Sequence, residues 1–122
     1  MARILIVDDS PSQLVGMKST VEKLGHQVVT AEDGAAGVET AKRELPDLIL
    51  MDVVMPNLNG FQATRTIAKD PKTSHVPIVL VTTKDQDTDR VWGMRQGAKA
   101  YVTKPIDDAE LTRVIKEYLP AA

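Results

Sequence analysis

Short apolar runs alternate along the chain with longer stretches in which apolar residues recur every three or four positions. The runs are continuous and rich in Val, Ile and Leu, which is typical of strands buried on both faces of a parallel sheet. The spaced stretches are typical of helices that bury one face. We expect strands at residues 3–7, 27–31, 47–52, 77–82 and 99–103. We expect helices at residues 11–24, 38–45, 61–68, 85–96 and 107–119.

The order of these elements predicts an α/β fold. Strands and helices alternate with short connections, and right-handed crossovers then place helices on both faces of one parallel sheet. We therefore expect a doubly wound, flavodoxin-like (βα)5 sandwich of three layers, with the strand order 2-1-3-4-5. Folds of this kind bind ligands beyond the carboxyl ends of the strands, next to the point where the strand order reverses.

Polar residues gather where the predicted strands end. Asp8 and Asp9 follow the first strand, Asp52 ends the third, Thr82 ends the fourth, and Lys104 follows the fifth. In the order 2-1-3-4-5 the first and third strands are neighbours, so the three aspartates should converge. Each residue also has a simpler interpretation, as a helix cap, a turn residue, a strand hydroxyl or a solvated lysine. Four such coincidences at one edge of the sheet are improbable, and we favour a site.

The residue types indicate phosphoryl chemistry. Three neighbouring carboxylates repel one another unless a cation neutralises them, and oxygen ligands with no His or Cys favour Mg²⁺ over zinc. A carboxylate can act as a nucleophile and form an aspartyl phosphate. A metal ion, a lysine ammonium and a hydroxyl are the groups that stabilise a phosphoryl group in transfer.

Composition narrows the range of functions. The chain has 122 residues, a formal net charge of −2, no cysteine and four aromatic residues. This length suits one domain, so we expect residues 1–122 to form a single unit with no separate output domain. The charge and the few aromatic residues argue against nucleic-acid binding, and the absence of a long apolar run or signal peptide argues against membrane insertion. We expect a cytoplasmic monomer.

Five motifs in this order resemble the CheY-like receiver domains of response regulators. They are Ile6-Val7-Asp8-Asp9, Met51-Asp52 with Met55-Pro56 and Asn59-Gly60, Val81-Thr82-Thr83, Gly97-Ala98, and Tyr101 with Lys104-Pro105. The stretches at residues 61–65, 83–86 and 91–98 further resemble stand-alone regulators of twitching motility.

The resemblance implies a role for each site residue. Asp52 would accept the phosphoryl group, while Asp8, Asp9, Asp52 and the backbone carbonyl of Val54 would bind Mg²⁺. Thr82 and Lys104 would bind phosphoryl oxygens. Thr82 and Tyr101 would form the conformational switch, and the Lys104-Pro105 peptide bond would be cis.

Two further sets of residues are expected to set the rate of dephosphorylation and to meet a partner protein. Val54 and Lys84 depart from the best-known chemotaxis pattern and would flank the water that attacks the aspartyl phosphate, so we expect them to tune dephosphorylation; the direction for Lys84 stays open. The surface that meets a partner protein would include Arg90, Trp92, Met94 and Tyr101, although Trp92 could instead pack inward.

The implied function is that of a stand-alone two-component response regulator. A histidine kinase of a chemotaxis-like pathway would phosphorylate it, and it would dock to a downstream motility or kinase-pathway protein, in control of type IV pilus twitching motility. It would assist its own phosphorylation and dephosphorylation without being an enzyme. The alternatives are a phosphorelay intermediate or phosphate sink, a small Mg²⁺-dependent phosphatase on a similar fold, and a scaffold with a degenerate site. The loop after the first strand lacks both the glycines of a nucleotide site and the Asp-x-Asp spacing of an aspartate phosphatase.

Overall fold

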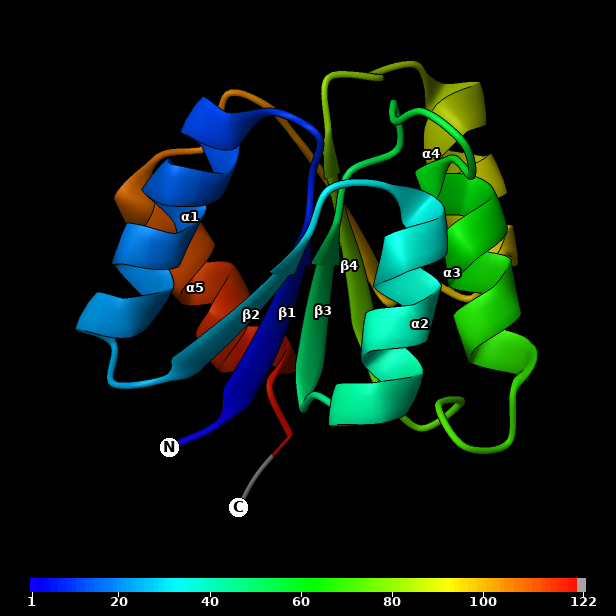
Figure 1. Ribbon diagram of the computed structural model, residues 1–122. Helices are drawn as coiled ribbons and strands as arrows, with labels where there is room; N and C mark the ends of the chain where they lie inside the picture. The colour runs from blue at the N-terminus through cyan, green and yellow to red at the C-terminus, as the bar shows by residue number, and fades with distance from the viewer. Residues whose placement is uncertain (121–122) are drawn as a thin grey trace.

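The computed structural model describes residues 1–120 and shows a parallel sheet between two layers of helices (Figure 1). The strands are β1 (Arg3–Val7), β2 (Gln27–Ala31), β3 (Leu48–Met51), β4 (Ile78–Thr82) and β5 (Ala100–Thr103). The helices are α1 (Pro11–Lys23), α2 (Gly34–Glu44), α3 (Gly60–Lys69), α4 (Asp87–Arg95) and α5 (Asp108–Tyr118). The sheet order β2-β1-β3-β4-β5 confirms the predicted topology.

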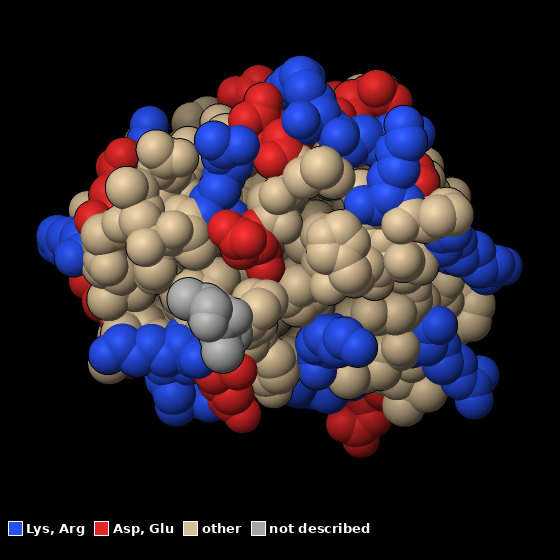
Figure 2. Space-filling view, turned by 90° about the horizontal axis from the view of Figure 1, so that it is seen from below, with Lys and Arg blue, Asp and Glu red and all other residues tan. Residues whose placement is uncertain are grey.

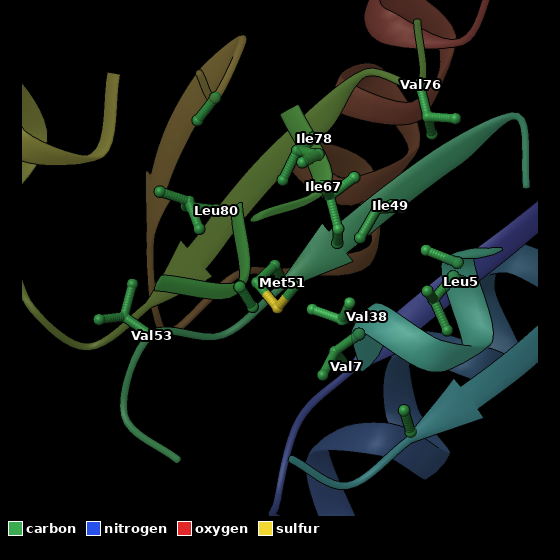
Figure 3. Close-up of a cluster of buried hydrophobic side chains, with 14 residues drawn as sticks. Leu5, Val7, Val38, Ile49, Met51, Val53, Ile67, Val76, Ile78 and Leu80 are labelled. Atoms are coloured by element: carbon green, nitrogen blue, oxygen red, sulfur yellow. The ribbon is translucent and has the colours of Figure 1, made fainter. Parts of the chain in front are cut away.

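The alternation of side chains along each buried strand divides the core into two parts. Leu5 and Val7 of β1 join the cluster under α2, α3 and α4, which Figure 3 shows in close-up. Ile4 and Ile6, which point to the opposite face, join the cluster under α1 and α5. Because both faces of β1 are covered, its apolar residues are continuous along the chain rather than alternating.

Local signals begin most helices close to the expected residues, but α2 begins at Gly34, four residues before the expected position 38, because the Asp33 side chain caps it there. Ser10 is the N-cap of α1, with Pro11 in the first turn, and Asp33, Asn59 and Asp107 cap α2, α3 and α5 through their side chains. The prediction of Leu45 as part of the second helix was wrong. Leu45 ends α2 in the left-handed conformation, with φ of 46°, and its side chain is 51% exposed. The Pro at position 46 disfavours a helical conformation for the residue before it.

The register between β1 and β3 places Asp8 and Asp52 side by side at the carboxyl end of the sheet. Val7 of β1 pairs with Met51 of β3, so that the next residues, Asp8 and Asp52, follow neighbouring strands. The Asp52 N–H donates to the Val7 carbonyl at 2.9 Å. This edge lies at the top of Figure 1, where the strands end and the loops to the following helices begin.

The opposite end of the molecule, which carries the N-terminus, is seen in Figure 2. Basic and acidic side chains are interspersed around its rim. Among residues 1–120, no helix has the length and apolar character needed to cross a membrane.

Candidate functional site

The site is an acidic cluster with one lysine, Lys104, whose side chain is 9% exposed. Oxygens of Asp8, Asp9 and Asp52 lie within 4.8 Å of one another, Asp8 and Asp52 being buried and Asp9 exposed. The Lys104 Nζ lies 2.6 Å from Asp8 Oδ2 and 3.5 Å from Asp52 Oδ2. With all four groups ionised, the three carboxylates and one ammonium leave a formal charge of −2, which a single divalent cation would neutralise.

Backbone geometry orients the carboxylates. The Val53 N–H donates to Asp52 Oδ1 at 2.7 Å, so the other oxygen, Oδ2, faces Lys104. In Asp8 the Oδ1 atom accepts from the Ser10 N–H at 2.9 Å, while Oδ2 accepts from Lys104. Each buried carboxylate thus has one oxygen held by the backbone and one that faces the centre of the cluster.

The closeness of α3 to Asp52 requires glycine at position 60. A Cβ atom placed on Gly60 would lie 2.0 Å from the carbonyl oxygen of Asp52, far inside contact distance. The Gly60 N–H donates to the Val53 carbonyl at 2.9 Å, which closes the base of the loop that follows Asp52. The Asn59-Gly60 pair therefore serves both as helix start and as a close contact with the site.

Burial and two neighbouring charges together set the pKa of the Asp52 carboxyl. Burial raises the pKa of its carboxyl above the ordinary value, Lys104 opposes this, and Asp8 adds to it. Ionised Asp52 is therefore less stable here than in water, and a cation placed among the carboxylates would stabilise it.

Thr82 and Tyr101 are linked through the backbone of Lys84. The Lys84 N–H donates to Thr82 Oγ1 at 3.4 Å, and the Tyr101 hydroxyl donates to the Lys84 carbonyl at 2.7 Å. Burial, chiefly, raises the pKa of Tyr101 to about 12, so its hydroxyl remains a donor at neutral pH. Thr82 pairs with Thr103 at the end of the sheet, and the Lys104 N–H donates to the Thr82 carbonyl at 2.8 Å.

The residues of the expected partner surface lie on and beside α4, separate from the carboxylates. The Trp92 and Met94 side chains are 49% and 45% exposed. The Arg90 guanidinium lies 5.4 Å from the centre of the Tyr101 ring and donates to the Tyr101 carbonyl at 3.2 Å. The Lys104-Pro105 peptide bond is cis.

Val54, two residues after Asp52, and Lys84, two residues after Thr82, lie close to each other. Val54 is 56% exposed, and both residues line a shallow hollow together with Val53, Met55, Asn59 and Phe61. The Lys84 ammonium lies 3.8 Å from an Asp89 oxygen.

One contact near the site was not found from the sequence. Asn57 Nδ2 donates to Asp33 Oδ2 at 2.9 Å, across 24 positions of the chain. Local turn signals were present, because Asp33 directly precedes Gly34 at the start of α2 and Asn57 follows a proline. No local pattern, however, indicates that these two side chains meet.

The comparisons with known proteins agree with this geometry. The family model for the response regulator receiver domain matches residues 4–116. Protein PilH of Pseudomonas aeruginosa is 57% identical over 119 residues, which cover 98% of both chains. The response regulator PleD of Caulobacter vibrioides is 43% identical over 110 residues, which cover 90% of this chain and 24% of PleD.

Solved structures show the same fold. The chemotaxis protein CheY4 of Vibrio cholerae superposes with a TM-score of 0.92 at 29% identity, covering 98% of this chain and 99% of that one. The receiver domain of a Pseudomonas aeruginosa sensor histidine kinase, described with a magnesium ion in its active-site cleft, gives 0.90 at 32% identity, with 98% of each chain covered. Family model, relatives and fold agree, and the chain belongs to the response-regulator receiver family.

Proposed function

We propose that this chain is a cytoplasmic response regulator that accepts a phosphoryl group on Asp52 from the phosphohistidine of a kinase, in a Mg²⁺-dependent reaction. The observation that carries the proposal is the buried Asp52 carboxylate, with one oxygen held by the Val53 N–H and the other facing Lys104. A carboxylate oxygen would attack phosphorus, forming a P–O bond as the P–N bond to the histidine breaks. The imidazole leaves with the bonding electrons and takes up a proton.

The donor set fits Mg²⁺. The available ligands are carboxylate oxygens, and the three carboxylates with the Lys104 ammonium carry a formal charge of −2, which matches a divalent cation. We propose Asp8, Asp9, Asp52 and the Val54 carbonyl as the groups that hold the ion, directly or through water. When bound, Mg²⁺ would neutralise charge on the transferring phosphoryl group.

Lys104 and Thr82 would act on the same phosphoryl group from the protein side. Lys104 is already within 3.5 Å of the acceptor, so its ammonium can bind a phosphoryl oxygen with little rearrangement. Thr82 would turn its hydroxyl toward another oxygen, which would break the bond that it accepts from the Lys84 N–H. Because the Lys84 carbonyl also holds the Tyr101 hydroxyl, this turn would be transmitted to Tyr101 and to the surface of α4.

The surface around α4 is the proposed docking site for a downstream protein. Val91, Trp92 and Met94 are large apolar side chains that stay about half exposed, and aromatic and Met side chains are enriched in interfaces. Arg90 and Tyr101 border them. We propose that the protein acts as a monomer in chemotaxis-like control of type IV pilus twitching motility, and the similarity to PilH supports this role.

The decisive experiment is phosphotransfer. The wild-type chain, Asp52→Asn and Glu39→Gln are incubated with radiolabelled phosphorylated kinase or acetyl phosphate, with Mg²⁺ or with EDTA. Wild type and Glu39→Gln, which changes an exposed carboxylate on α2, should be labelled only with Mg²⁺, and Asp52→Asn should not be labelled. Undiminished labelling of Asp52→Asn would disprove Asp52 as the acceptor. Return of the label to a second histidine protein would favour the relay or phosphate-sink role over docking.

Val54 is proposed to lengthen the life of the phosphorylated state. Its side chain is exposed beside the acceptor and has no polar group with which to orient an attacking water. Val54→Asn should therefore speed the loss of label from the phosphorylated protein after the donor is removed. An unchanged rate would disprove this role for Val54.

A further inference from the structure

The loop that joins β3 to α3 is held at two points. At its base, the Gly60 N–H donates to the Val53 carbonyl at 2.9 Å. At its far end, the Asn57 side chain donates to Asp33 at 2.9 Å. The segment 54–56 lies between these points and includes Val54, whose carbonyl is a proposed metal ligand.

The far end of the loop is shaped for contact with the start of α2. Asn57 has a φ of 67°, a left-handed conformation that Asn adopts more readily than most residues. A Cβ atom on Gly34, the first residue of α2, would lie 1.9 Å from the Leu58 carbonyl oxygen. The backbone of the loop therefore rests directly against the first turn of α2.

Asp33 connects the loop and the helix through its two carboxylate oxygens. Oδ1 accepts from the Ala36 N–H at 2.8 Å and caps α2, whereas Oδ2 accepts from Asn57. These two bonds lower the pKa of Asp33, the cap contributing most, so it is ionised at neutral pH. The bond to Asn57 is therefore charge-assisted and stronger than one between neutral groups.

Apolar packing alone does not orient the segment 54–56. Met55 and Leu58 pack in part against the core, but such contacts are non-directional and do not by themselves select one orientation of the peptide planes. Val54 itself is exposed. A directional bond at the far end of the loop restricts that rotation.

We propose that Asp33 and Asn57 form a clamp that orients the β3–α3 loop, and with it the Val54 carbonyl, for binding Mg²⁺ beside Asp52. The inference rests on the proposed metal site and adds to it a pair of positioning residues that touch neither metal nor phosphate. Groups that orient metal ligands from outside contribute to affinity without contacting the ion.

Two substitutions remove the clamp while keeping the local backbone. Asp33→Ser retains a good N-cap, but its side chain is too short to reach Asn57. Asn57→Gly retains access to positive φ. Isothermal titration with Mg²⁺ alone should show about ten-fold weaker binding for each variant, the lower end of the range expected for one charge-assisted hydrogen bond that orients a metal ligand. The double variant should be no weaker than either single one, because both remove the same bond.

Two controls separate the clamp from loss of a cap or of a charge. Asp107→Ser changes the matched cap of α5, where Asp107 accepts from the Glu110 N–H at 2.8 Å, and it should leave Mg²⁺ affinity within about two-fold. The exchanged pair Asp33→Asn/Asn57→Asp restores the bond with the donor and acceptor reversed. Its new amide can still cap α2, so it should recover wild-type affinity, which a purely structural loss would not allow.

The outcomes that oppose the clamp are distinct. Affinities of Asp33→Ser and Asn57→Gly within two-fold of wild type would overturn it, as would additive losses in the double variant or an equal loss in Asp107→Ser. A wild-type chain that binds no Mg²⁺ would overturn both the clamp and the metal site of the proposed function.

Discussion

Replacing Asp52 by Asn is expected to stabilise the chain when no divalent cation is present. Asp52 is 7% exposed, and its carboxylate lies among those of Asp8 and Asp9. Asn has nearly the same shape and no charge, so Asp52→Asn removes the charge and preserves the packing. The ion pair between Lys104 and Asp8 remains, because it does not involve Asp52.

The magnitude follows from the distances. At 4.8 Å, the limit for the three carboxylates, two like charges repel by about 3.5 kcal/mol with an effective dielectric constant of about 20. The Lys104 ammonium, 3.5 Å from Asp52, attracts it by about 4.7 kcal/mol on the same scale. Since water screens the exposed Asp9, these two terms leave a net attraction of at most about 1.2 kcal/mol. The cost of burying the charge exceeds this attraction, because the pKa of Asp52 is raised and burial is the largest cause. We expect a gain in unfolding free energy of about 1–2 kcal/mol, which raises the Tm by about 4–8 °C for a chain of this length.

The gain should depend on pH. Burial raises the pKa of Asp52 above the ordinary value of 3.8, so the folded chain binds this proton more tightly than the unfolded chain does. The stability of wild type relative to Asp52→Asn therefore falls as pH rises above about 4, through the interval between the two pKa values. Below that interval the carboxyl is protonated in both states, and this difference should disappear.

The assay is thermal unfolding followed by circular dichroism at pH 7, in EDTA and in Mg²⁺. At 100 times its Kd, Mg²⁺ should stabilise wild type by about 2.7 kcal/mol, or about 10 °C in Tm. Asp52→Asn lacks one anionic ligand and should gain less. The control Glu39→Gln should melt within about 2 °C of wild type. A Tm of Asp52→Asn at or below that of wild type in EDTA would refute the reasoning.

Three further substitutions test the energetics of the fold by urea unfolding in EDTA. Lys104→Met removes the only ammonium that contacts the buried Asp8 and Asp52 carboxylates within residues 1–120, and should destabilise the chain by about 3–5 kcal/mol; a loss below about 1 kcal/mol would contradict this pairing. Thr64→Val replaces a buried hydroxyl that has no hydrogen-bond partner in the described part of the chain and should stabilise by about 1 kcal/mol, whereas a loss would indicate a partner for that hydroxyl. Leu45→Gly relieves an exposed side chain held at φ of 46° and should stabilise by up to about 1 kcal/mol, while the β-branched Leu45→Val should not.

The elements were predictable because each carries its own periodicity and end signals. The continuous apolar run of β1 indicated a strand covered on both faces, and Ser10-Pro11 indicated the start of α1. Helix α4 was less well defined. It begins at Asp87, two residues later than expected, because several residues before it are polar and none marks a boundary.

The sequence predicted which residues form the candidate site. It did not predict the hydrogen bonds and ion pairs that these residues make with one another. Acidic, hydroxyl and lysine residues at strand ends indicated that Asp8, Asp52, Thr82 and Lys104 would gather at one edge. The sequence did not show that Lys104 pairs more closely with Asp8 than with Asp52, at 2.6 Å against 3.5 Å. That difference depends on how the loop after β5 crosses the site.

The sequence by itself determined the order of strands and helices and the residue types at the strand ends, because these follow from local periodicity and composition. The same residue types are the basis of the phosphoryl chemistry that we propose. Only the tertiary structure decided which side chains meet across long separations, such as Asp33 with Asn57 and Tyr101 with the Lys84 carbonyl. Strand register and the close approach of glycine backbones set such contacts, and both result from packing the whole chain at once.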